Sequence, residues 1–181
     1  MGKIIAAGIP ERVTDRSRLQ EIYDLRITAY ENSHKSGIIN RTLLPNGWSD
    51  NMDASAIHWV IQNENEIIAS ARINNIHHLH EIAADLSGCA LPPERPFALF
   101  GRLVVHPSYR NMELGKKLTT ARQEYVVNNR IPFALACSFE DRRTFLLQQG
   151  FRELGEVDYR WEGNDLAPIK QHLFIYKTEL N

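Results

Sequence analysis

The stretch FALFGRLVVHPSYRNMELGKKL, residues 97–118, constrains the fold of this chain more than any other part of it. It opens with an apolar run that ends at His106-Pro107, and a polar turn follows. The apolar residues after the turn, Leu114 and Leu118, lie four positions apart, which is the spacing of one face of a helix. The pattern predicts a buried strand that passes through a tight turn into the N-terminus of a helix.

The predicted turn suits a ligand that carries phosphate groups. A helix N-terminus presents backbone N–H groups without intrahelical partners, together with the positive end of the helix dipole. Arg110 and Lys116 add positive charge nearby. We therefore expect this turn to form a site for a phosphate-bearing ligand.

The same stretch resembles the acyl-CoA signature of the GNAT-type N-acetyltransferases, roughly L-x-V-x-P-x-x-[RQ]-x-x-G-x-[GA]-x-x-L. The residues that match it in register are Leu103, Val105, Pro107, Arg110, Gly115 and Leu118. The sequence departs at the first glycine of the pattern, where Glu113 stands. A glycine there lets the backbone approach the coenzyme pyrophosphate closely. A glutamate can point to solvent, but its charge would weaken an anion site if it turned inward.

The resemblance also implies which residues bind the coenzyme. In the family, two strands separate after the signature strand, and pantetheine lies in the gap against the exposed strand edge. A backbone N–H of that edge would polarise the thioester carbonyl, and the loop amides would bind the pyrophosphate. The coenzyme-binding residues that the resemblance implies are Leu103, Val104, Val105, Arg110, Asn111, Met112, Glu113, Leu114, Gly115 and Lys116.

The usual proton donor of the family is missing from the sequence. Many members carry a tyrosine four residues before the glycine that closes the penultimate helix, and that position is Leu146 here. The family's asparagine near the start of the same helix is replaced by Phe139. Ser138, Cys137 or a water could protonate the departing thiolate, or the thiolate could leave unaided. Glu81, His106 and the histidines near residue 78 are weak candidates for the base, because no motif places them.

The resemblance extends over essentially the whole chain. It predicts an α+β fold with three layers (α/β/α), in which a mixed, mostly antiparallel central sheet of about seven strands carries helices on both faces. We expect residues 1–181 to form a single acyl-CoA N-acyltransferase domain. The elements that the patterns predict are strands at 3–7, 56–62, 66–74, 97–105, 132–138, 151–161 and 168–178, a helix capped by Thr14 or Asp15 and running to about Glu31, a loop at 32–52, a short helix near 80–86, a helix ending near Asn129, and a helix at 140–149 closed by Gly150.

Composition excludes several classes of protein. A net charge of −1 gives no general attraction to nucleic acid or to anionic membranes. No apolar run approaches the roughly 20 residues of a membrane span, and the start of the chain lacks the apolar core of a secretory signal. We expect a cytoplasmic protein with Cys89 and Cys137 as free thiols. We expect no metal, because His77, His78 and His80 with Cys89 match no ligand spacing.

A second resemblance concerns three segments, residues 23–30 (YDLRITAY), 70–74 (SARIN) and 101–110 (GRLVVHPSYR). They look like parts of acyl-homoserine-lactone synthases and N-acyl amino acid synthases, which often take acyl groups from acyl carrier protein. An acidic carrier protein would need a basic face, although scattered basic residues are more often a solvated surface. The basic residues concerned are Arg41, Arg72, Arg102, Arg110, Lys116 and Lys117. We expect Trp48, Trp59 and Trp161 to anchor the core or loops, and Tyr109 to be a turn residue.

Three functions remain open at this point. The first is transfer of acetyl from acetyl-CoA to a primary amine by direct attack in a ternary complex. The second is transfer of a longer chain from acyl-CoA or acyl carrier protein, and the third is a catalytically weak domain that binds acyl-CoA. The acceptor amine and the formation of a homodimer, through the last pair of strands, stay open as well.

Overall fold

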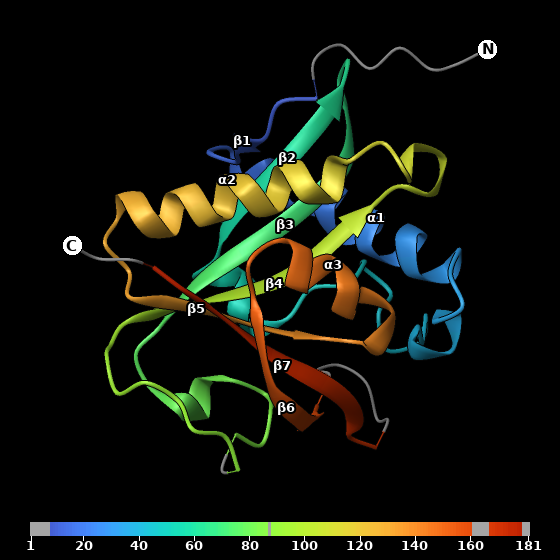
Figure 1. Ribbon diagram of the computed structural model, residues 1–181. Coiled ribbons are helices and arrows are strands. Elements are labelled where there is room, and N and C mark those ends of the chain that lie inside the picture. The colour runs from blue at the N-terminus through green and yellow to red at the C-terminus, as the bar shows by residue number, and fades with distance from the viewer. Residues whose placement is uncertain (1–7, 87, 161–166, 179–181) are drawn as a thin grey trace. The chain divides into compact units, whose positions relative to one another are not determined.

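The computed structural model describes residues 8–86, 88–160 and 167–178. Figure 1 shows its helices and strands. The regular elements are β1 (Glu11–Arg12), α1 (Leu19–Glu31), β2 (Ile57–Asn63), β3 (Glu66–Ile76), β4 (Phe97–Val105), α2 (Leu114–Asn128), β5 (Phe133–Ser138), α3 (Arg143–Gln148), β6 (Arg152–Tyr159) and β7 (Ile169–Lys177). Short 3-10 helices lie at Arg16–Arg18, Ser36–Ile38, Asn51–Ala54, Leu79–Glu81, Pro107–Tyr109 and Glu140–Arg142. The predicted strand at 3–7 and Trp161 fall outside the described residues.

The strands form one mixed sheet of seven strands, in the order β1-β2-β3-β4-β5-β7-β6. β4 and β5 pair in parallel, with Ala98–Phe100 opposite Ala134–Ala136. The pairs β1–β2, β5–β7 and β6–β7 are antiparallel. This arrangement confirms the predicted α+β architecture with a mixed sheet.

The chain divides into two compact units, of which the first comprises Met1–Arg72 and Arg102–Ala121. In this unit, neighbouring residues of the hairpin β2–β3 bury their side chains in different clusters. Val60 and Ile67 pack with residues of α1, whereas Ile61 and Ile68 pack with Leu118 and its neighbours on α2. Because successive side chains of a strand point to opposite faces, the two helices cover opposite faces of this hairpin.

The second unit comprises Ile73–Gly101 and Arg122–Asn181. Its core joins the C-terminal part of α2, helix α3 and the strands β4, β5 and β7. Leu146 of α3 is buried in this core, next to the partly buried Phe145. Gly150 follows α3 with φ = 80°, as the predicted helix-closing glycine requires.

One local prediction needs correction, and two others gain detail. The helix predicted near 80–86 is only a 3-10 turn at Leu79–Glu81. The first helix begins with a separate 3-10 turn that Asp15 caps through its side chain. Tyr109 lies in the turn after β4 but is buried in the core of the first unit, and its hydroxyl accepts a hydrogen bond from Asn63.

The loop between α1 and β2 is closely packed at Gly47. This residue has φ = +81°, and a Cβ placed on it would lie 2.7 Å from the Cβ of Tyr23 on α1. The backbone of the loop therefore lies directly against α1 at Gly47. The following residue also contacts the helix, because Trp48 N donates a hydrogen bond to Tyr23 O. Only a residue without a side chain fits this position at its present backbone conformation.

We therefore expect Gly47→Ala to lower the free energy of unfolding by about 2–4 kcal/mol, because it combines an overlap with a strained φ. Urea denaturation measures the change. Gly37→Ala is the matched control, because a Cβ there meets nothing within 4 Å, and its effect should stay within about 1 kcal/mol. Equal effects of the two substitutions would contradict the close approach at Gly47.

Candidate functional site

The first part of the candidate site is the end of β4, where Leu103, Val104 and Val105 lie in the first unit. The amide of His106 donates to Ile68 O of β3 over 2.8 Å. Successive N–H groups of a strand point to alternate sides. The amides of Leu103 and Val105 therefore point away from β3.

The second part is the loop between β4 and α2. The turn at Pro107–Tyr109 is capped by His106, whose Nδ1 accepts from the amide of Ser108. Further along, Lys117 N donates to Glu113 O over 3.0 Å. The amides of Leu114–Lys116 lie in the first turn of α2, where no carbonyl of the same helix is available to accept from them. These amides and the dipole of α2 can bind an anion.

Glu113 occupies the position of the missing glycine in a backbone conformation that glycine favours. Its φ is 56°, and that of Asn111 is 63°. The Glu113 side chain is 73% exposed, and its Oε1 lies 3.7 Å from Lys116 Nζ. The carboxylate therefore points to solvent rather than into the loop, and the residue carries the strain of a left-handed conformation with a Cβ.

The guanidinium of Arg110 contacts the end of α1. Its two terminal nitrogens donate to Ala29 O over 2.7 Å and to Asn32 O over 2.8 Å. Both carbonyls lie at the C-terminus of the helix, where a positive charge is stabilising. The side chain of Arg110 thus fixes the loop onto α1. Met112, two residues later, packs against the core of the first unit.

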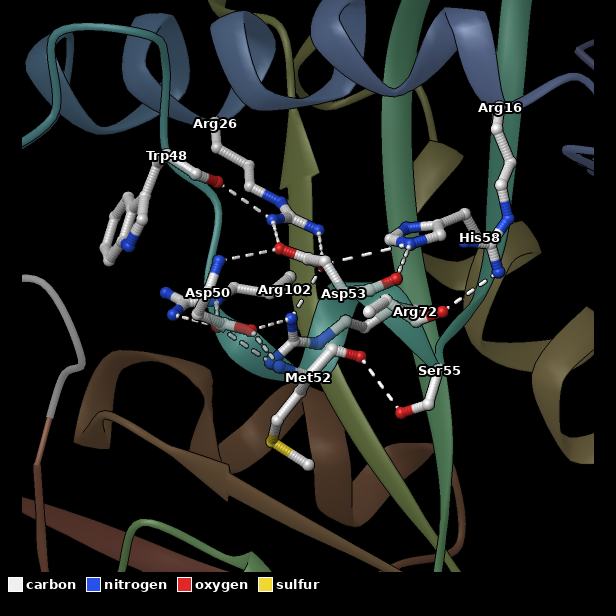
Figure 2. A network of polar contacts seen from close by, with 11 residues as sticks. Arg16, Arg26, Trp48, Asp50, Met52, Asp53, Ser55, His58, Arg72 and Arg102 are labelled. Carbon is white, nitrogen blue, oxygen red and sulfur yellow. Dashed lines mark hydrogen bonds and ion pairs between the residues drawn. The ribbon is translucent and has the colours of Figure 1, made fainter.

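A buried network of charged residues lies in the same unit, shown in Figure 2. Asp53 accepts two hydrogen bonds from Arg26 of α1 and one from Arg72 of β3, at 2.7–2.8 Å. The amide of Asp50 donates to the same carboxylate. We call the five residues Arg26, Asp50, Asp53, Arg72 and Arg102 the arginine–aspartate cluster.

Asp50 is the second carboxylate of the cluster and binds Arg72 and Arg102. Its carboxylate accepts hydrogen bonds from Arg72 and from Arg102 of β4. The ring of Trp48 lies under the Arg102 guanidinium, with 4.3 Å between the guanidinium carbon and the ring centroid. Arg26 also donates to Trp48 O. One short loop segment, residues 48–53, therefore contacts α1, β3 and β4.

The electrostatics of the cluster keep its carboxylates ionised. Burial alone raises the pKa of Asp53, but the hydrogen bonds and charges of Arg26 and Arg72 outweigh burial and hold the pKa well below its usual range. The pKa of Asp50 is likewise lowered, because the charges of Arg102 and Arg72 outweigh its burial. Burial lowers the pKa of the neighbouring His58, which favours its neutral form.

The cluster corrects one sequence prediction. Arg72 and Arg102 were expected in a basic face or a solvated surface, yet their side chains are only 3% and 6% exposed. Arg41 instead pairs on the surface with Glu31. Trp48 is buried in the core, as expected of an anchor.

Comparison with known proteins identifies a family for this chain, and its match includes the strand, turn and helix described above. A family model described as "Acetyltransferase (GNAT) family" matches residues 19–151. The chain belongs to the GNAT acetyltransferase family. No curated protein sequence matches the chain significantly.

Solved structures share the fold of this GNAT protein at low sequence identity. One is described as an acetyltransferase of the GNAT family from Staphylococcus aureus, with a TM-score of 0.61 and 15% identity over 93% of this chain and 98% of that one. Another is FeeM, an N-acyl amino acid synthase from uncultured soil microbes (TM-score 0.63, 14% identity, 93% and 89% covered). A third, from Corynebacterium glutamicum, is described as histone acetyltransferase HPA2 and related acetyltransferase (0.64, 14%, 96% and 97%).

As a member of this family, the GNAT protein is an acyltransferase that uses acyl-CoA as co-substrate and an amine as acceptor. Among the described residues, no group of three or more histidine, cysteine or acidic side chains is arranged to hold a metal ion. Within that same part of the chain, no helix is both long enough and apolar enough to cross a membrane.

The catalytic candidates from the sequence lie in different units. His106 is in the first, whereas Glu81 and Ser138 are in the second. The Glu81 carboxylate accepts from the amides of His77 and His78, and the His78 contact is the main reason that its pKa is lowered. Ser138 ends β5, opposite His172 of β7.

Sequence reasoning missed the arginine–aspartate cluster. Two of its arginines were noted only as basic residues, and its aspartates were not singled out. A signal was present, because the DNMD segment that begins at Asp50 has the form of a 3-10 cap, with two aspartates three residues apart. The sequence offered no reason to pair these aspartates with arginines that lie 19–52 positions away.

The cluster predicts a large loss of stability when one carboxylate is neutralised. We expect Asp53→Asn to lower the free energy of unfolding by about 3–5 kcal/mol, because it leaves buried arginines without their counter-charge. Urea denaturation at neutral pH measures the loss. Glu31→Gln removes the carboxylate of the exposed pair with Arg41 and should change the free energy by less than about 1 kcal/mol.

The pH dependence provides a second check on the same variant. A carboxylate with a lowered pKa stabilises the fold above its unfolded pKa of about 3.9, and this contribution disappears as the pH falls toward the folded value. The difference in stability between wild type and Asp53→Asn should therefore shrink below about pH 4. A difference that stays constant down to pH 2 would contradict the ionised, arginine-bound state of Asp53.

Proposed function

We propose that this protein transfers an acetyl group from acetyl-CoA to a primary amine by direct attack in a ternary complex, and that residues 1–181 act as a single acyl-CoA N-acyltransferase domain. The observation that carries the proposal is the loop after β4, which leads directly into the first turn of α2, where the amides have no acceptor within their own helix. A diphosphate is the ligand that such a helix terminus suits. The family of the chain supports acyl-CoA as the compound that supplies it.

Different residues of this loop would contact different parts of the coenzyme or hold the loop in place. The amides of Asn111 through Lys116 would hold the pyrophosphate, with Gly115 allowing close approach. The side chain of Arg110 contributes by fixing the loop to α1. Bound acetyl-CoA would supply the acetyl group as a thioester. The amides of Leu103 and Val105 point away from β3, and either can stabilise the charge that develops on the thioester oxygen.

Proton transfer has fewer candidates. Leu146 is buried in an apolar core and has no proton to give. Burial raises the pKa of Cys137 to about 12, which makes its thiol a poor donor to a thiolate. The remaining donors are the Ser138 hydroxyl and a water, or the thiolate leaves unaided. Glu81 already accepts backbone hydrogen bonds, and its lowered pKa makes it a weaker base. The Nδ1 atom of His106 already accepts a hydrogen bond from the amide of Ser108.

Calorimetric titration with acetyl-CoA tests the proposal, with dephospho-CoA and a long-chain acyl-CoA as comparators. We expect micromolar binding of acetyl-CoA, followed by turnover of one or more amines in a panel of primary amines. Gly115→Trp is the control for the loop: it should abolish binding while the thermal unfolding temperature stays nearly unchanged. Unchanged affinity in this variant would refute the assignment of the loop.

Other outcomes have definite meanings. Clearly tighter binding of the long-chain thioester would replace acetyl transfer by transfer of longer chains. Absence of binding to all three compounds would lead to acyl carrier protein as the next donor to test. Binding without turnover of any amine would indicate a domain that binds acyl-CoA as a ligand.

Glu113 gives a further prediction about this loop. Glu113→Gly should tighten the binding of coenzyme A several-fold, because it removes both a negative charge near the anion site and the strain at φ = 56°. Glu113→Gln removes only the charge. If the two variants bind equally well, charge alone explains the gain. Weaker binding in Glu113→Gly would show that Glu113 has a positive role in the loop.

A further inference from the structure

β4 contains one residue in a conformation that strands do not use. Arg102 has φ = 50°, although the strand continues through it from Phe97 to Val105. This is the left-handed region, which is unfavourable for residues with a Cβ. Some contact must therefore hold Arg102 in place.

A single left-handed residue inside a strand is typical of a β-bulge. After Arg102, side chains of β4 alternate between two clusters of the first unit. Val104 packs with residues of α1, whereas Leu103 and Val105 pack against the cluster that contains Leu118 of α2. We therefore place a bulge at Arg102, where the regular conformation of the strand is interrupted.

The side chain of Arg102 is held by the arginine–aspartate cluster. Its Nε and Nη2 both donate to Asp50 Oδ2, and its guanidinium lies over the ring of Trp48. Asp50 is itself immobilised, because its carboxylate also accepts from Arg72 and from Met52 N. Figure 2 shows this arrangement of Asp50, Arg72 and Arg102.

We propose that Asp50 is a positioning residue for acyl transfer, which acts through Arg102 to hold the bulge that aims the amides of Leu103 and Val105. Asp50 does not contact acyl-CoA in this proposal. The proposal rests on the proposed function, because those amides are the ones that serve the thioester there. Without the anchor, the strained residue returns to an extended conformation, and the residues after it rotate out of register.

A pair of substitutions at Arg102 separates backbone shape from side-chain chemistry. Arg102→Ala and Arg102→Gly both remove the guanidinium, but only glycine adopts a positive φ without strain. We expect kcat to fall at least about tenfold in Arg102→Ala, because the oxyanion-stabilising amide moves. In Arg102→Gly it should stay within about threefold of wild type, because glycine keeps the bulge unaided.

The affinity for coenzyme A provides the contrast that a general loss of structure would not show. Its Kd should change by less than about threefold in both variants, because the pyrophosphate loop lies outside the bulge. Equal losses of kcat in the two variants would overturn the proposal, since the guanidinium itself would then be required. Unchanged kcat in both would overturn it as well, since the bulge would not need an anchor.

Asp50→Asn extends the test and covers the case in which Arg102→Ala does not fold. Alone, it should lower kcat about tenfold, whereas in the Arg102→Gly background it should have little further effect. Additive losses in the double variant would contradict an action of Asp50 through Arg102.

A structural readout keeps this test separate from the proposed function. Amide NMR shifts of Leu103 and Val105 in the ligand-free protein should change in Asp50→Asn and stay close to wild type in Arg102→Gly. If the wild type transfers no acetyl group but these shifts behave as expected, the positioning role stands and the proposed function fails. Shifts that do not respond to Asp50→Asn would refute the positioning role itself.

Discussion

Two buried aspartates, each bound to two arginines, are the interaction on which the first unit depends. Asp53 joins α1 to β3, and Asp50 joins β3 to β4, so four segments distant in the sequence meet at two carboxylates. Burial of such charges is costly unless every one is paired and hydrogen-bonded. The cluster contains three arginines and only two aspartates. If one aspartate is lost, no other carboxylate of the cluster is free to replace it, so each aspartate is necessary to the arrangement.

The cluster also explains how strained backbone persists in the functional part of the molecule. Arg102, Asn111 and Glu113 all have positive φ values. Arg102 lies within β4, and the other two lie in the loop between β4 and α2. Strain of this kind survives only where the surroundings over-determine the conformation. Asp50 and Trp48 supply that constraint at Arg102, and the bonds of Arg110 to α1 supply it for the loop that follows.

The sequence predicted the regular elements well where local pattern decides them. β4 has the predicted bounds, β3 begins at the predicted residue, and α2 ends within one residue of the prediction. Alternation and helical spacing are local properties, so they can be seen in one chain. The helix expected near 80–86 failed because the segment has no periodic apolar face of sufficient length to stabilise more than a single turn.

The sequence by itself determined the fold class, the family and the loop that leads into α2, because the motif contains the turn and the glycine that this geometry needs. Only the tertiary structure decided that Arg72 and Arg102 are buried, that Glu113 points outward and that Asp50 anchors a bulge in β4. The physical reason is the sequence distance between the partners. The sequence shows that a residue is charged. Only the folded structure shows which oppositely charged residue lies beside it and allows it to be buried.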